Sequence, residues 1–170
     1  MWWSESRRKI WLQRALLGGC LLWLSACGFQ FRTAPDFPAD MGITYIQTDD
    51  RYSLFYHELV SALRRNRIAL SEDATAAHTV IRILGDQTGR RTLTVTARNV
   101  PAEYEVYYRL TFSVDVDGSE AVPYEELVLT RDYPFDETQV LGKANEEQLI
   151  MQVIARDLVG LVSRRLTAID

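Results

Sequence analysis

The chain has 170 residues, of which 47% are hydrophobic and 25% are charged, and its formal net charge at pH 7 is −4. A chain of this length suits one domain with a sizeable core. The acidic balance argues against nonspecific binding to nucleic acids, because contacts with phosphates require an excess of basic residues.

Residues 1–26 have the layout of a secretory signal. Four basic residues precede an apolar run at 15–24, and two small residues follow. This apolar run is too short to form a membrane-spanning helix, and the residues on either side of it are typical of a secretory signal instead. Cys27 comes directly after the small residues, so the sequence LSAC at 24–27 resembles a bacterial lipobox.

The lipobox resemblance implies a lipid anchor at Cys27. In such signals the cysteine thiol receives a diacylglycerol, cleavage makes the cysteine the first residue, and its amine is usually acylated as well. Each buried CH₂ contributes about 0.8 kcal/mol, so several acyl chains hold a protein on a bilayer. Gly28 stands where an aspartate would resemble an inner-membrane retention signal, so the resemblance points to the outer membrane.

Two alternatives to this anchor stay open. An ordinary secretory signal could precede an incidental cysteine. A second lipobox-like sequence, LGGC, ends at Cys20, but it leaves only residues 15–19 as an apolar core after the last basic residue. Such signals use an apolar core of about 7–15 residues, so Cys27 is the preferred anchor.

Removal of residues 1–26 leaves 144 residues with a net charge of about −7, because the segment carries four basic residues and one glutamate. An anionic ligand would then need a local basic patch that opposes the global field. Residues 27–40 are expected to be the acylated N-terminus and an extended tether. Residues 41–170 are expected to form a single domain without disulfides, because both cysteines precede it.

The first part of this domain predicts one strand and one helix. Residues 41–48 are rich in β-forming side chains and predict the first strand. Within residues 52–65, Phe55, Leu59 and Leu63 recur every four residues. This spacing places them on one stripe and predicts an amphipathic helix.

The central part of the chain predicts an antiparallel sheet. Residues 78–87 indicate a strand, and residues 92–98 indicate its continuation or a separate strand, with glycines between them that suit a bulge or a turn. Residues 103–117 alternate apolar and polar side chains without a break, which is typical of a strand with one buried face. Residues 125–135 are expected to be its partner strand, after a hairpin loop at 117–124.

A long amphipathic helix is expected at the end of the chain. The sequence NEEQ at 145–148 resembles a capping box that starts the helix. The apolar residues that follow on one helical face are Leu149, Ile150, Val153, Ile154, Leu158, Leu161, Val162, Leu166 and Ile169. The order β-α-β-β-β-α predicts an α+β fold, with two helices packed on one face of a mostly antiparallel four-stranded sheet.

The sequence contains no strong catalytic or metal-binding motif. His57 and His78 are its two histidines, and a zinc site would need both of them with remote carboxylates. Glu103 and Glu105 share one face of the predicted strand, where a solvated surface is a simpler interpretation than an acid/base pair. No nucleophile elbow or nucleotide-binding glycine motif occurs. We therefore expect no enzyme, no metal and no cofactor.

Basic residues are the better candidates for a binding site. Arg90 and Arg91 follow a glycine between the two predicted strand segments, and Arg98 precedes a proline-containing turn. Arginines at a hairpin tip can donate charge-assisted hydrogen bonds to phosphates, but a solubilising exposed turn explains them equally well. Lys143 is the only lysine after residue 26, and its position alone indicates nothing.

Three short motifs resemble the LptE family of lipopolysaccharide-assembly lipoproteins. Residues 27–32 (CGFQFR) are similar to the start of the mature family members, 98–104 (RNVPAEY) to a turn of the family, and 143–148 (KANEEQ) to the start of its last helix. The turn is one residue shorter than the usual form and has Pro101 in place of a polar, glycine-containing tip. The order of elements agrees, so the resemblance covers essentially the whole chain after the signal.

The resemblance implies a non-enzymatic role in the outer membrane. Members of the family plug the lumen of the β-barrel LptD, assist its assembly, bind lipopolysaccharide and help to deliver it to the cell surface. Carried onto this sequence, the basic residues Arg98 and Lys143 would contact the phosphates of lipopolysaccharide, and Arg90 and Arg91 would extend the patch. The implied partners are an LptD-like barrel, lipopolysaccharide and the membrane.

Two other interpretations stay open. The protein could be a lipid-anchored hydrolase of the cell envelope that uses His57 or His78 with a carboxylate. It could also be a periplasm-facing adaptor of another envelope complex that binds a protein and no lipid. If both histidines are replaced by alanine, growth and envelope integrity should survive under the family role and fail if the protein is a hydrolase. Charge reversal at Arg98 and Lys143 tests the adaptor interpretation, because unchanged lipopolysaccharide binding would remove the reason for naming these two residues.

Overall fold

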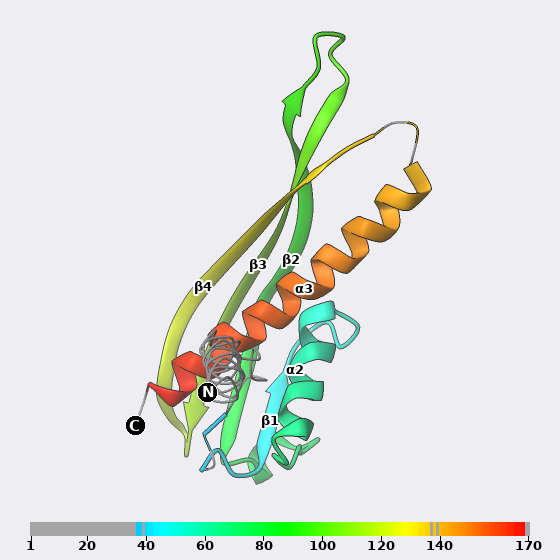
Figure 1. The fold of residues 1–170 in the computed structure, drawn as a ribbon. Coiled ribbons are helices and arrows are strands. Elements are labelled where there is room, and N and C mark those ends of the chain that lie inside the picture. The colour runs from blue at the N-terminus through cyan, green and yellow to red at the C-terminus, as the bar shows by residue number, and fades with distance from the viewer. Residues whose placement is uncertain (1–36, 39, 137, 139, 169–170) are drawn as a thin grey trace, which may run out of the picture. The chain divides into compact units, whose positions relative to one another are not determined.

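The computed structural model describes residues 37–38, 40–136, 138 and 140–168 (Figure 1). The elements in chain order are β1 (Thr44–Gln47), α2 (Leu54–Arg65), the short 3-10 helix η1 (Ala74–Ala76), β2 (Thr79–Val95), β3 (Pro101–Val116), β4 (Ser119–Pro134) and α3 (Val140–Thr167). The predicted order of strands and helices and the α+β class are confirmed. The signal, Cys27 and most of the tether lie outside the described residues, so those expectations stay predictions.

The four strands form one mixed sheet in the order β1-β2-β3-β4 (Figure 1). β1 runs parallel to β2, whereas β2 with β3 and β3 with β4 are antiparallel pairs. The parallel pair needs a crossover connection, and α2 supplies it between β1 and β2. The sheet is therefore mostly antiparallel, as predicted, with a first strand shorter than the expected 41–48.

β2 resolves the alternative that the sequence left open at residues 92–98. It is one strand of 17 residues that pairs with β3. The register shifts between Ile83 and Gly85, which indicates a bulge where Leu84 is exposed, and it shifts twice more between Thr92 and Val95. β1 ends opposite Arg82, so the rest of β2 has a strand neighbour on one side only.

The connection between β3 and β4 corrects the loop predicted at residues 117–124. The turn consists of Asp117 and Gly118, whose φ angles are 51° and 77°, and β4 begins at Ser119. Positive φ at both central residues is typical of a type I′ hairpin turn, which Asp-Gly favours. Pro123 suggested a loop, but it lies in the edge strand β4, where a residue without an N–H is tolerated.

Both helices pack on one face of the sheet and cover its apolar side chains (Figure 1). Phe55, Leu59 and Leu63 of α2 are fully buried, as their spacing predicted. The side chains that β3 contributes to the core are Val106, Tyr108, Leu110, Phe112 and Val114. Burial of each large apolar side chain stabilises the fold by about 1.5–3 kcal/mol, so this single layer is the main source of stability.

α3 differs from its prediction at its start and on its exposed side. It begins at Val140, before the capping box expected at 145–148. Ile154 and Leu158 are fully buried, but Leu149 is 62% and Val153 is 44% exposed. The prediction placed all of them on one buried face. Leu149 and Leu158 are nine positions apart, which is two and a half turns at about 3.6 residues per turn, so they lie on opposite sides of α3. The prediction of one shared face was therefore wrong for Leu149 and Val153, which lie away from the core.

Ile169, the last residue of the predicted apolar face, lies outside the described residues. None of the helices in the described part of the chain combines the length and the apolar character that are needed to cross a bilayer.

Candidate functional site

The four basic residues predicted to bind lipopolysaccharide lie on three parts of the fold. Arg90 and Arg91 are in β2, Arg98 is in the turn between β2 and β3, and Lys143 is in the first turns of α3. In Figure 1 the β2–β3 turn and the start of α3 lie toward the same end of the sheet. The fold therefore gathers these positions at one end of the sheet, but not on one surface.

Arg90 and Arg91 lie on opposite faces of the sheet. The register places Arg90 opposite Val106 and Arg91 opposite Glu105. Directly opposite residues of antiparallel strands share a face, and Val106 belongs to the core beneath the helices. Arg90 is therefore on the helix-covered face, and Arg91 is on the open face.

Arg90 is held by α3 and by an aromatic ring. Its guanidinium donates to the Glu147 carboxylate at 2.8 Å, and the Tyr133 hydroxyl donates to the same carboxylate oxygen at 2.7 Å. The guanidinium also lies over the Tyr104 ring, 5.0 Å from its centre. The hydrogen bond that Arg90 donates to Glu147 raises the pKa of Arg90. Burial, and then the Glu147 carboxylate, raise the pKa of Tyr133 to about 12.

Arg91 and Lys143 also have carboxylate partners. Arg91 forms an ion pair with Glu105, whose side chain is only 11% exposed, on the open face of β2 and β3. Lys143 donates to Glu146 at 2.8 Å, and the Lys143 side chain is largely covered. An anionic ligand at either position has to compete with these carboxylates for the same cation.

Arg98 lies at the exposed tip of the β2–β3 hairpin. The Thr96 N–H donates to the Val100 carbonyl at 2.8 Å and closes this tip. Asn99 has a φ of 60°, in the left-handed region that asparagine enters more readily than most residues. The predicted turn followed Arg98 and contained Pro101, whereas in the structure Arg98 lies in the turn itself and Pro101 is the first residue of β3.

The sequence did not identify the carboxylates that hold these basic residues. Glu105 was assigned to a solvated strand face, and its pairing with Arg91 requires a register that only the sheet defines. Glu147 was assigned to a helix start, and its contact with Arg90 joins residues 57 positions apart. No local pattern in the sequence could have found either pair.

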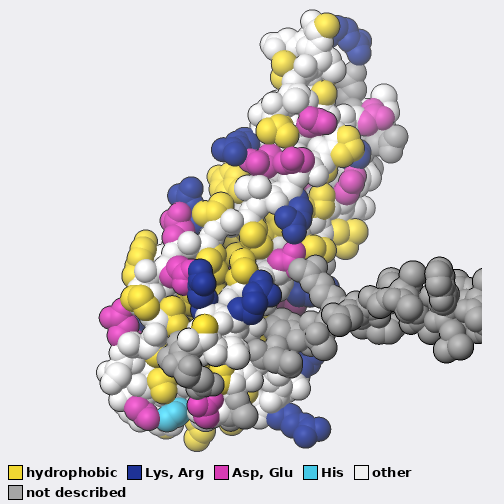
Figure 2. Space-filling view, turned by 60° about the vertical axis from the view of Figure 1, so that its left-hand side comes forward, with side chains coloured by type: hydrophobic (Ala, Val, Ile, Leu, Met, Phe, Trp, Pro, Cys, Tyr) yellow, Lys and Arg dark blue, Asp and Glu magenta, His cyan; other side chains and the backbone are white. Residues whose placement is uncertain are grey.

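The sheet face opposite the helices is polar. Ion pairs join Arg82 to Asp115 and Arg109 to Glu126 on this face. Thr111 lies between the two pairs, opposite Gly85 and Glu126 in the register, and is 7% exposed. The open face therefore offers many hydrogen-bonding groups to a polar partner. Figure 2 draws a different side of the molecule, on which acidic and basic side chains lie among hydrophobic ones.

The two histidines occupy different elements. His57 is exposed on α2, whereas His78 pairs with Asp117 beside the β3–β4 turn. Within the described ranges, no group of three His, Cys, Asp or Glu side chains is placed to hold a metal ion.

Solved structures share this architecture. Lipoprotein B from Nitrosomonas europaea matches with a TM-score of 0.65 and 22% identity, over 83% of this chain and 94% of that one. The rare lipoprotein B from Shewanella oneidensis matches with a TM-score of 0.59 and 24% identity, over 75% of this chain and 92% of that one. At these identities the likeness shows the fold.

Sequence relatives identify the family. The LPS-assembly lipoproteins LptE of Yersinia pestis (strain Pestoides F) and Yersinia pseudotuberculosis serotype O:1b (strain IP 31758) are each 23% identical over 153 residues. The match spans 89% of this chain and 74% of each relative. The family described as "LptE: Lipopolysaccharide-assembly" matches residues 42–166, which is most of the chain. The resemblance seen in the three motifs is thus confirmed, and the chain belongs to the LptE lipopolysaccharide-assembly family.

Proposed function

We propose that this protein is a non-enzymatic outer-membrane lipoprotein that plugs and helps to assemble an LptD barrel and binds lipopolysaccharide for delivery to the cell surface. The family match over residues 42–166 is the observation that carries the proposal. The name of the Yersinia relatives points to the same process. Cys27, in its lipobox-like sequence, is the proposed acylation site. The anchor keeps the domain close to the barrel and raises its effective concentration there.

The open face of the sheet supports the plug role. The lumen of a membrane β-barrel is polar, so a domain inside it needs a surface rich in hydrogen-bonding groups. Arg109 and Glu126 pair on this face, and Tyr107 lies on it beside them in the register. These side chains can exchange bonds with a polar wall without exposing the core, which the helices cover from the other side.

The proposed contacts with lipopolysaccharide centre on the end of the sheet that carries the hairpin. Arg98 at the exposed tip meets a phosphate first. Lys143 and Arg90 already bind the neighbouring carboxylates Glu146 and Glu147, so a phosphate there would replace an internal anion. Arg91 contributes from the opposite face and is the least favourably placed of the four.

The first test is a pull-down from outer membranes without crosslinking. The full chain carries a tag after Asp170, and mass spectrometry identifies what is retained. We expect a stoichiometric barrel protein of LptD size together with lipopolysaccharide, because a domain enclosed by a lumen dissociates slowly. A protein recovered alone from mild detergent would contradict the plug role and favour an adaptor for another complex.

The lipopolysaccharide site has its own test. The double variant Arg98→Glu, Lys143→Glu reverses both charges and should weaken lipopolysaccharide binding by at least about tenfold. Each cation would otherwise donate a charge-assisted hydrogen bond to a phosphate. The matched control is Arg164→Glu, an exposed position in the last turn of α3. Equal affinities of the double variant and the control would show that Arg98 and Lys143 do not form the site.

A further inference from the structure

A small cavity lies between α2 and the edge strand β1, away from the residues assigned above. Its volume is about 130 Å³, and polar groups dominate its lining. β1 pairs with Thr79–Arg82 only, so the cavity lies near the opposite end of β2 from Arg90, Arg91 and the hairpin tip. The proposed function does not use this part of the fold.

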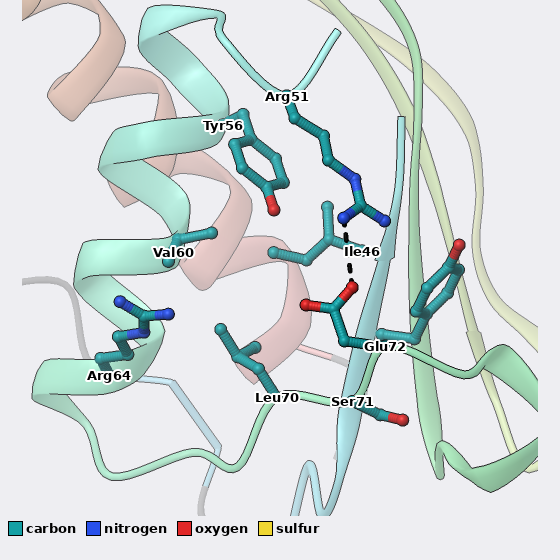
Figure 3. Close-up of a pocket in the computed structure, with 9 residues that line it drawn as sticks. Ile46, Arg51, Tyr56, Val60, Arg64, Leu70, Ser71 and Glu72 are labelled. Carbon is teal, nitrogen blue, oxygen red and sulfur yellow. Dashed lines mark hydrogen bonds and ion pairs between the residues drawn. The ribbon is translucent and has the colours of Figure 1, made fainter. Parts of the chain in front are cut away.

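Two arginines and a tyrosine give the cavity its chemistry. In Figure 3, Arg51 enters from the chain before α2, Arg64 comes from the last turn of the helix, and the Tyr56 hydroxyl points into the space between α2 and β1. Ile46, Val60 and Leu70 are the aliphatic part of the lining. The cavity therefore offers two cations and a neutral donor to an occupant.

The backbone of β1 adds donor capacity. The N–H of Thr44 donates to the Ala69 carbonyl, and the C=O of Thr44 accepts from the Ser71 N–H. Both groups of Thr44 therefore point away from β2, toward the free edge of β1. Alternate residues of a strand turn these groups to the same side, so Ile46, which lines the cavity, also directs its N–H to this edge. No backbone partner for the Ile46 N–H occurs beyond β1 in the described residues.

Glu72 already places an anion at the cavity. Its carboxylate accepts from Arg51 at 3.1 Å (Figure 3), but its side chain is 88% exposed. An ion pair this exposed contributes little to stability and is easily exchanged. Arg64 has no ion pair among the described residues, so its charge is available to a second anion.

We infer that this cavity binds a phosphate group, with Arg51, Arg64 and the Tyr56 hydroxyl as donors and Glu72 displaced toward solvent. A phosphate has more acceptor oxygens than a carboxylate, so it suits donors that approach from two sides. The phosphate can be free in solution or belong to a lipid headgroup. Both sources present the same oxygens to the arginines.

The test uses the full chain in detergent and calorimetric titration with inorganic phosphate. Arg51→Gln and Arg64→Gln should each weaken binding by at least about tenfold, because each removes one charge-assisted donor. Glu72→Gln should strengthen it by up to about fivefold, because it removes the competing anion. The matched control is Arg65→Gln, which removes the same charge from the neighbouring residue outside the cavity lining and should stay within about twofold.

A second arm uses intact and phosphatase-treated lipopolysaccharide and distinguishes the two sources. If Arg64→Gln weakens binding only of the intact form, the phosphate is that of a lipid headgroup. If Arg64→Gln weakens only the binding of inorganic phosphate, the ligand is free phosphate. Equal losses in Arg65→Gln and Arg64→Gln, or no saturable binding of phosphate in either form, would overturn the inference. These variants leave Arg98 and Lys143 intact, so failure here is distinct from failure of the proposed function.

Discussion

At the scale of single residues, Tyr108 ties the first helix to the centre of the sheet. Its side chain is 1% exposed, and its hydroxyl accepts a hydrogen bond from the Phe55 N–H at 3.0 Å. This N–H is one of the donors that the first turn of a helix leaves without an intrahelical partner. Burial, followed by a hydrogen bond with the Asp86 carboxylate, raises the pKa of Tyr108 above its ordinary value.

The raised pKa of Tyr108 predicts a loss of stability in alkali. The folded protein holds the phenol proton more tightly than the unfolded chain, so this contribution is complete below pH 10 and falls as the pH rises above it. Tyr108→Phe should cost about 1–3 kcal/mol at pH 7, because the buried Phe55 N–H loses its acceptor. It should also reduce the loss of stability that occurs above pH 10, which urea unfolding at pH 9 and at pH 11 measures. An unchanged pH dependence would show that another group is responsible.

At the scale of elements, α3 shows how the position of an apolar residue around the helix axis decides whether it is buried. Leu158 is fully buried, whereas Leu149 is 62% exposed although both were predicted on one face. The two residues are nine positions apart, which is two and a half turns at about 3.6 residues per turn. They therefore lie on opposite sides of α3, and only the side of Leu158 packs on the core.

This contrast makes a prediction for α3. Leu158→Ala should destabilise the domain by about 2–5 kcal/mol, because it leaves a cavity between the helix and the sheet. Leu149→Ala is the matched control and should change the free energy of unfolding by less than about 0.5 kcal/mol, because its side chain remains largely in water. Chemical denaturation measures both. Similar losses in the two variants would mean that Leu149 is covered in the protein.

At the scale of the whole molecule, the domain is a sheet whose central hairpin is longer than the layer of helices that covers it. The side chains of Thr92–Val95 are exposed, and β2 has a strand neighbour on one side only beyond Arg82. At the other end, β2 lies between β1 and β3. Register shifts between Thr92 and Thr94 and between Thr94 and Val95 also interrupt the pairing with β3 near the tip. The two ends of this strand therefore differ in stability.

Amide hydrogen exchange should reveal this gradient. The amides of residues 92–95 should exchange through local opening, at rates well above those of Thr79 to Ile83, which should exchange only when the whole domain unfolds. The measurement is made on the full chain under native conditions. Equal protection at both ends would contradict local opening and require a cover over the hairpin tip.

The sequence alone determined those features that depend on local patterns. The spacing of Phe55, Leu59 and Leu63 predicted a buried helix face, and the alternation at 103–117 predicted a half-buried strand. The order of these elements was sufficient to predict the fold class, because each apolar face needs another to cover it. Three short motifs indicated the family, which the match over residues 42–166 then established.

Only the tertiary structure decided which residues share a surface. Arg90 and Arg91 are neighbours in the chain, but the pleat of the strand places them on opposite faces. Arg90 and Glu147 are distant in the chain, but the packing of α3 on the sheet brings them to 2.8 Å. A local sequence pattern specifies the direction of a side chain relative to its own helix or strand. Its partners depend on strand register and helix packing, which are set by contacts between distant parts of the chain.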